Sequence, residues 1–132
     1  MAFYIDTSAA VKLAVAETES EPLRTFLARH DDGLVASSLL VVEMRRAALR
    51  SGDPITALAA TRPILESIHL VRISDAILQR ASTLMPATIR SLDAIHLATA
   101  LSLGTMAQGM VCYDKLLGEA ATNQGVDVHS PR

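Results

Sequence analysis

The sequence predicts an α/β fold in which helices cover both faces of a mostly parallel sheet of four to five strands. Short apolar runs alternate with longer amphipathic stretches along the chain, which is typical of strands alternating with helices. Such alternation requires crossover connections, and these connections join parallel strands. The length of 132 residues fits a single domain, residues 1–132.

Five runs are predicted to be strands because each is short, apolar and bounded by polar or turn-forming residues. Asp31, Asp32 and Gly33 give a turn signal before the second run, and Gly109 opens the fourth. The predicted strands are residues 3–5, 34–36, 70–73, 110–113 and 126–128.

The stretches between these runs show helical periodicity and helix-end signals. Thr7 or Ser8 is expected to cap the first helix, and Ser37 or Ser38 the third. Pro63 is expected to break or kink the fourth. The predicted helices are residues 8–15, 21–29, 38–50, 54–67, 75–84, 92–103 and 115–123.

The composition limits the chemistry open to the chain. Its one cysteine, Cys112, excludes an internal disulfide and a cysteine-based metal site, and it agrees with a reducing, cytoplasmic location. We expect no signal peptide, because the start lacks basic residues, and no apolar run reaches the ~18 residues of a membrane helix. Aromatic residues make up 3% of the chain, which disfavours binding of single strands by base stacking.

Two aspartates directly follow predicted strands. Asp6 comes after residues 3–5, and Asp114 comes after residues 110–113. In parallel α/β sheets, ligands bind beyond the carboxyl ends of the strands, so both aspartates are candidate site residues. Each is equally suited to capping the helix that follows it, and the pattern leaves these two interpretations open.

Two further candidate acids lie within helices. Asp93 opens a helix that is apolar in nearly every direction, where a carboxylate is costly unless it is paired or binds a cation. The alternative is simple stabilisation of Asp93 by the helix dipole. Glu43 lies in an apolar run, and its local pattern favours a plain salt bridge to Arg46, three positions later.

The four acids come from four separate segments that an α/β fold can bring to one edge of the sheet. Carboxylates in close contact cannot all remain ionised without a counter-charge. Mg²⁺ suits such a set because it binds through a few carboxylates and keeps waters for the substrate. The chemistry indicated is metal-assisted hydrolysis of phosphodiester bonds.

Several motifs resemble those of the PIN-domain nucleases and, within them, the VapC-type ribonuclease toxins of bacterial toxin–antitoxin pairs. They follow the family's order and spacing from residue 4 to about residue 128. The resemblance implies a compact three-layer α/β/α domain that holds Mg²⁺ or Mn²⁺. The motifs are YIDTSA (4–9), Glu43 with Arg46-Ala47, RSLDAIHLATA (90–100), VCYDKLL (111–117), Ala120-Ala121 and Gly125-Val126.

The resemblance also assigns roles to individual residues. Asp6, Glu43, Asp93 and Asp114 match the family's four catalytic acids, in that order, and Asp6, Asp93 and Asp114 are the expected metal ligands. Ser8 matches a hydroxyl position that supports the first aspartate. The expected partners are an RNA substrate, a small antitoxin protein whose tail blocks the acidic site, and a second copy of the chain in a homodimer, with no membrane involved.

Three residues near the candidate acids are ambiguous. His96 shares a helical stripe with Asp93, and a hydrogen-bonded core histidine is favoured over a metal ligand. Arg90 is a candidate RNA-phosphate contact or, equally, a bridge to a carboxylate. Cys112 stands where family members often carry Thr, and it is expected to be buried and inert.

Other functions remain open alongside the toxin ribonuclease. The chain could be a PIN-fold RNA-processing nuclease outside a toxin–antitoxin pair, or a non-catalytic interaction module with the same fold. Aspartyl phosphotransfer through Asp6 is disfavoured, because the usual pattern places a second aspartate where this chain has Ser8.

Overall fold

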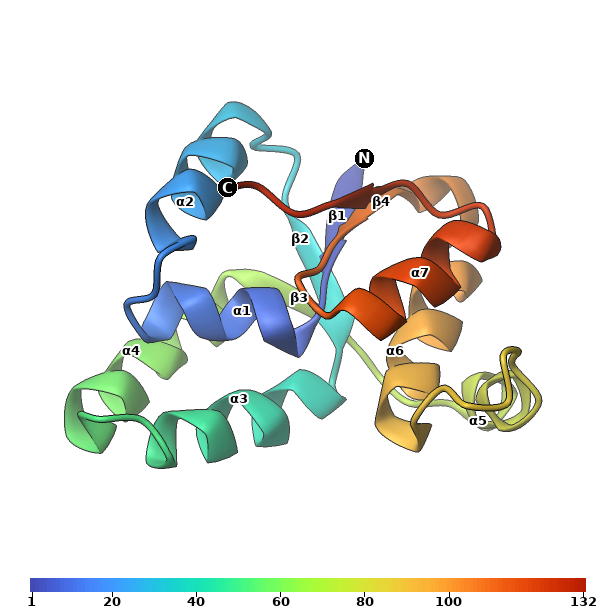
Figure 1. The fold of residues 1–132 in the computed structure, drawn as a ribbon, viewed down its shortest axis with the longest axis horizontal. Coiled ribbons are helices and arrows are strands. Elements are labelled where there is room, and N and C mark those ends of the chain that lie inside the picture. Colours follow the sequence, from blue (N-terminus) through green and yellow to red (C-terminus); the bar gives the residue numbers. More distant parts are fainter.

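A five-stranded parallel sheet with helices on both faces forms the centre of the computed structural model, which describes residues 1–132 (Figure 1). The strand order is β3-β2-β1-β4-β5, and each neighbouring pair is parallel. The predicted α/β fold is therefore confirmed. The strands are β1 (Ala2–Ile5), β2 (Leu34–Ser37), β3 (Ile68–Val71), β4 (Ala107–Val111) and β5 (Val128–His129).

Seven α-helices form the two outer layers. Figure 1 shows α1 to α4 on one side of the sheet and α5 to α7 on the other. None of them combines the length and the apolar character that are needed to cross a bilayer. The helices are α1 (Thr7–Ala14), α2 (Ser20–Arg29), α3 (Leu39–Leu49), α4 (Pro54–Glu66), α5 (Asp75–Ser82), α6 (Ser91–Ser102) and α7 (Lys115–Asn123), and a short 3₁₀ helix, η1 (Gly104–Met106), precedes β4.

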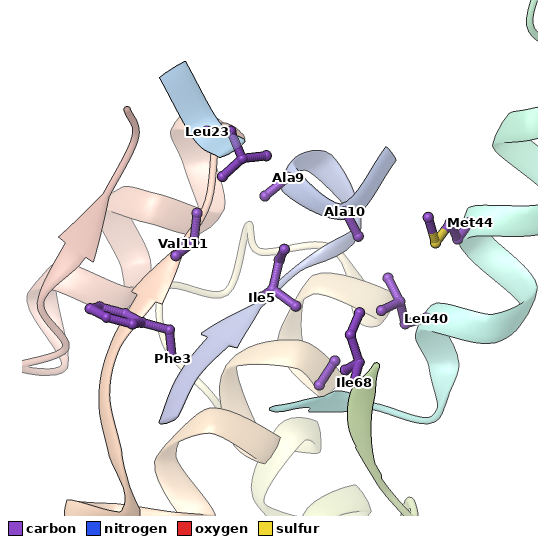
Figure 2. Close-up of a cluster of buried hydrophobic side chains, with 10 residues drawn as sticks. Phe3, Ile5, Ala9, Ala10, Leu23, Leu40, Met44, Ile68 and Val111 are labelled. Atoms are coloured by element: carbon purple, nitrogen blue, oxygen red, sulfur yellow. The ribbon is translucent and has the colours of Figure 1, made fainter. Parts of the chain in front are cut away.

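The core has two parts because successive side chains of a strand point to opposite faces of the sheet. Phe3 and Ile5 of β1 pack against α1, α2 and α3 in the cluster drawn in Figure 2. Tyr4 lies between them in sequence but packs on the other face, with Leu97 of α6 and Leu117 of α7. The central strand β1 is therefore covered on both sides, which places its carboxyl end well inside the molecule.

The strand order reverses direction at β1. The chain proceeds from β1 to β2 and β3 on one side, and then returns to add β4 and β5 on the other. In open α/β sheets, ligands bind at the carboxyl ends of the strands beside such a reversal. Asp6 directly follows β1, and Asp114 lies a few residues beyond β4, so both stand at this point.

Three strands differ from the predicted ranges by two or more residues. The fourth, predicted at 110–113 and opened by Gly109, spans Ala107–Val111, because the chain already pairs with β1 from Ala107 onward and Gly109 lies inside the strand. The third strand was placed at residues 70–73, but it spans Ile68–Val71 and pairs with β2 along its whole length. It is an edge strand with an exposed His69, so it does not need the apolar run that the prediction relied on. The fifth, predicted at 126–128, is only Val128–His129, because the Val126 N–H instead closes the end of α7 on Ala121.

Two helix-end predictions were wrong. Pro63, expected to break or kink the fourth helix, does not break α4, which continues to Glu66, since a proline in the last turn disturbs only one backbone bond of the helix. The first helix is capped by Asp6 rather than by Thr7 or Ser8. The remaining predicted helices lie within two residues of the observed ends, which is the usual uncertainty of helix boundaries.

Candidate active site

A cavity of about 410 Å³ opens at the carboxyl edge of the sheet, beside the point where the strand order reverses. All four candidate acids line it, although they come from separate places: the β1–α1 junction, α3, α6 and the β4–α7 junction. The lining is almost wholly polar. It consists of Asp6, Thr7, Ser8, Glu43, Arg90, Ser91, Leu92, Asp93, His96 and Asp114.

Asp6 is the most buried of the four acids, with 3% of its surface exposed. Its carboxylate accepts hydrogen bonds from the Ser8 hydroxyl, 2.8 and 2.9 Å from its two oxygens, and from the Ala9 N–H at 3.1 Å. The Cys112 thiol donates to Oδ2 at 3.4 Å. Asp6 therefore caps α1 and lines the cavity at the same time, so the two interpretations of its position are compatible.

Ser8 connects the two loops that carry the aspartates of β1 and β4. Its hydroxyl oxygen accepts the backbone N–H of Tyr113 at 2.9 Å and that of Asp114 at 3.2 Å, while its proton is donated to Asp6. These two loops are more than 100 positions apart in the sequence, and the Ser8 hydroxyl joins them. The expected support of the first aspartate by Ser8 thus takes the form of a three-way junction.

Asp93 and Asp114 share a cation from the protein itself. Arg90 donates from Nε to Asp93 at 3.3 Å and from Nη2 to Asp114 at 3.1 Å. The Arg90 side chain is 70% exposed, so it covers the mouth of the cavity rather than filling it. Asp114 also caps α7 by accepting the Leu117 N–H at 3.0 Å. Arg90 was expected to contact either RNA phosphate or a carboxylate, and in the structure it bridges two carboxylates.

Glu43 does not form the salt bridge to Arg46 that its local pattern favoured. Its Oε1 atom accepts the Thr7 hydroxyl at 2.6 Å and lies 2.6 Å from Nε2 of His96. The side chain of Glu43 points toward the sheet edge, whereas Arg46 is exposed on α3. The error arose because a three-residue spacing on a helix says nothing about a partner from a distant helix.

The structure adds two residues that sequence reasoning had not placed in the site, Thr7 and Tyr4. Both belong to the YIDTSA motif, but Thr7 was given no role beyond a helix cap and Tyr4 none beyond a buried strand. The Tyr4 hydroxyl lies 2.7 Å from Nδ1 of His96, which is itself 1% exposed. His96 is thus the hydrogen-bonded core histidine that was expected. A tyrosine inside a buried strand was the available signal, since a buried hydroxyl needs a partner.

Burial is the main influence on two of the acids. It raises the pKa of Asp6, although the bonds from Ser8 and the Ala9 N–H work in the opposite direction. It also raises the pKa of Asp93, assisted by the negative charge of Asp114 and opposed by Arg90. Both carboxylates therefore lack part of the positive charge that would balance them.

Glu43 is influenced differently. Burial disfavours its charged form, but the hydrogen bonds from His96 and Thr7 outweigh this effect, so the pKa of Glu43 is lowered. Burial also raises the pKa of the Cys112 thiol, and the charge of Asp6 adds to this shift. Cys112 remains protonated and serves as a weak hydrogen-bond donor, in agreement with the expected inert role.

The donor chemistry of the cavity fits a hard divalent cation. Asp6, Asp93 and Asp114 offer carboxylate oxygens, and the hydrogen bonds that reach Asp6 come from neutral groups. No three His, Cys, Asp or Glu side chains converge closely enough to form a finished metal cage. A cation would therefore have to displace Arg90 from Asp93 and Asp114 and use water for its remaining ligands.

Comparison with known proteins gives consistent results. A sequence model described as the PIN domain matches residues 3–114. Two proteins of Mycobacterium tuberculosis are similar over nearly the whole chain: ribonuclease VapC46 is 42% identical over 98% of both chains, and ribonuclease VapC47 is 35% identical over 97% of this chain and 96% of its own.

Among solved structures, a toxin–antitoxin complex from Klebsiella pneumoniae contains a chain with the same fold. The TM-score is 0.75 at 20% sequence identity, with 99% of this chain and 98% of that chain covered. At this identity the likeness establishes the fold, and the sequence relatives establish the family.

Proposed function

This chain belongs to the PIN-domain family and, within it, to the VapC ribonucleases, and from that premise we propose that it is an Mg²⁺-dependent endoribonuclease that acts as the toxin of a toxin–antitoxin pair. The observation that carries the proposal is the meeting of Asp6, Glu43, Asp93 and Asp114 around one cavity. An RNA substrate would place the protein in the cytoplasm.

In the proposed mechanism, Asp6, Asp93 and Asp114 would hold Mg²⁺, with Mn²⁺ as an alternative. Such an ion would supply positive charge to the phosphate and make water more acidic. Asp6 is short of positive charge, because burial raises its pKa and its hydrogen-bond donors are neutral. Within the protein, Arg90 balances the charge of Asp93 and Asp114. A divalent cation would supply positive charge to all three carboxylates.

Glu43 is proposed to accept a proton from the water that attacks phosphorus. Its lowered pKa keeps it ionised at neutral pH, as a proton acceptor must be. In this reaction the water oxygen bonds to phosphorus and the bond to the leaving ribose oxygen breaks. The attacking water's proton passes to Glu43, and solvent protonates the leaving oxygen.

Arg90 is proposed to contact the RNA phosphate once the cation has taken over its carboxylate partners. The side chain is long, 70% exposed and held only by two ion pairs at the mouth of the cavity. A guanidinium matches the geometry of phosphate oxygens and binds them with two parallel hydrogen bonds. The scarcity of aromatic residues further favours recognition of RNA by its backbone and shape.

An antitoxin is the proposed protein partner, and a homodimer the proposed assembly. The similar chain from Klebsiella pneumoniae was solved as part of a toxin–antitoxin complex, which supports the first part of this proposal. The bridge from Arg90 to Asp93 and Asp114 also supports it, because an arginine from an antitoxin tail could bind these carboxylates in the same way. Such an arginine would exclude the metal and block hydrolysis.

The test is cleavage of total cellular RNA by the purified protein, with and without Mg²⁺. Asp6→Asn and Asp93→Asn should each lose cleavage and growth arrest on induced expression, while circular dichroism stays unchanged. Asp75→Asn is the matched control. Asp75 lies in the first turn of α5, as Asp93 lies in the first turn of α6, but Asp75 is exposed and outside the cavity. Full cleavage by either site variant, or no cleavage by the wild type with Mg²⁺ or Mn²⁺, would contradict the proposal.

A further inference from the structure

A series of linked hydrogen bonds, most of them buried, runs from β2 to the cavity and ends on Glu43. The backbone N–H of Ser37 donates to the Tyr4 hydroxyl at 3.1 Å, and this hydroxyl lies 2.7 Å from Nδ1 of His96. On the other side of the imidazole, Nε2 lies 2.6 Å from Oε1 of Glu43. The series joins α6 on one face of the sheet to α3 on the other, across the carboxyl ends of β1 and β2.

The donors along this series have a definite direction. Because the Tyr4 oxygen already accepts the Ser37 N–H, its own proton is free to be donated to Nδ1 of His96. This direction assigns the imidazole proton to Nε2, from which it is donated to Glu43. The Thr7 oxygen also lies 3.2 Å from Nε2, but the Thr7 hydroxyl donates its own proton to Glu43. A bare Nε2 would instead set its lone pair against a carboxylate oxygen 2.6 Å away, which is unfavourable in a buried site.

The two oxygens of Glu43 are treated differently by the protein. Oε1 accepts from both Thr7 and His96, whereas no group of the chain donates to Oε2. No buried side-chain oxygen in the protein lacks a partner, so Oε2 must be open to solvent. Glu43 lines the cavity, and an oxygen that solvent reaches is available to a water in that cavity.

We propose that Tyr4 and His96 are positioning residues that fix the Glu43 carboxylate with Oε2 toward the cavity, where it accepts a hydrogen bond from the attacking water. This inference rests on the proposed ribonuclease function. Both residues act through Glu43, in the way that outer partners orient the carboxylates and histidines of enzyme sites; His96 borders the cavity but is 1% exposed. A purely structural tyrosine–histidine pair would affect folding but would not depend on Glu43.

Tyr4→Phe is the sharpest variant, because it removes one hydroxyl and keeps the ring in the core. We expect kcat to fall by about 10- to 100-fold with little change in KM, since the loss concerns the chemical step and not RNA binding. Thr61→Val is the matched control: it also removes one buried hydroxyl, which donates to the Leu58 carbonyl at 2.7 Å within α4 and does not line the cavity, so it should leave cleavage unchanged. The probe is a pool of short random-sequence RNA carrying a fluorophore and a quencher.

Coupling to Glu43 separates positioning from folding. In single-turnover reactions with excess enzyme, Tyr4→Phe added to Glu43→Gln should cause no further loss, because the group that it orients is already disabled. A loss by the same factor in both backgrounds would overturn the inference and indicate a structural role. Unchanged cleavage by Tyr4→Phe in an active wild type would overturn it as well.

A second readout is independent of activity. Long-range ¹H–¹⁵N spectra of histidine-labelled protein, assigned with His96→Asn, should show His96 protonated at Nε2 in the absence of RNA. A bare Nε2 would overturn the inference even if the protein is an active ribonuclease. Failure of the wild type to cleave any RNA in the pool or in a total-RNA preparation would instead overturn the proposed function, and the inference with it.

Discussion

The two sides of the cavity are built differently. On the side of β1 and β4, Asp6 is 3% exposed and is held by Ser8, Ala9 and Cys112, all of them neutral donors. On the side of α6, the Asp93 side chain is 18% exposed and is held by Arg90 alone. The contacts of Asp6 form as the sheet folds, whereas the ion pair between Arg90 and Asp93 can break and re-form without unfolding a helix or strand.

This difference implies that the two sides of the cavity have different roles in ligand binding. The buried side fixes where a cation would sit, because its donors are locked by backbone hydrogen bonds across β1 and β4. The exposed side can exchange one positive partner for another, because an arginine with a 70% exposed side chain is lightly held. Substitutions on the buried side should therefore change both stability and activity, and those on the exposed side mainly ligand affinity.

Ser8→Ala should have the largest combined effect, because it removes the junction of the buried side. It leaves the backbone N–H groups of Tyr113 and Asp114 without their acceptor, which costs about 1–3 kcal/mol of unfolding free energy. Cleavage should fall by about 10- to 100-fold, since Asp6 loses the hydroxyl that orients it. Urea denaturation and RNA cleavage are the two measurements.

The matched control for Ser8→Ala is Ser82→Ala, because the Ser82 hydroxyl donates only to a carbonyl of its own exposed helix end. That change should alter unfolding free energy by no more than about 0.5 kcal/mol. If Ser8→Ala is as mild as this control, the buried side is not held by the junction and the comparison between the two sides fails.

The sequence predicts the position of a site residue or strand well where neighbouring residues determine it, and poorly where distant residues do. Asp6 and Asp114 were placed at the sheet edge because strand ends and the rule for parallel sheets are local signals. Glu43 was paired with the wrong partner because its real neighbour, His96, is 53 positions away and comes from the opposite layer. The edge strand Ile68–Val71 was shifted by two residues because exposure weakens the apolar pattern.

A second prediction concerns the effect of pH on the buried side. Since burial raises the pKa of Asp6, the folded protein binds this proton more tightly than the unfolded chain, so stability is greatest at low pH and is lost as the pH rises through the raised pKa. Asp6→Asn should therefore increase the unfolding free energy at pH 7 in EDTA. The advantage should shrink as the pH falls toward 4, because protonation neutralises the wild-type residue as well.

Asp53→Asn is a control in which the effect of pH on the unfolding free energy should have the opposite sign. Asp53 also caps a helix, α4, but it is exposed, and the hydrogen bonds from Thr56 lower its pKa. Its carboxylate therefore stabilises the fold above the pKa of the unfolded chain, and this contribution disappears as the pH falls. Asp53→Asn should thus give no gain at pH 7. Equal behaviour of the two variants in urea denaturation would show that burial does not distinguish these two caps.

Arg90→Ala should give the smallest effect and should act on affinity rather than on stability. Without RNA, the two exposed ion pairs that compete with a cation for Asp93 and Asp114 are gone, so Mn²⁺ should bind more tightly. Two such pairs are worth about 1 kcal/mol together, which corresponds to an increase in affinity of up to about 5-fold by calorimetry. Arg62→Ala, which removes a similarly exposed ion pair to Glu66 on α4, should leave Mn²⁺ binding unchanged. Weaker Mn²⁺ binding by Arg90→Ala would mean that Arg90 supports the metal site instead of competing with it, and the exposed side would then be as fixed as the buried one.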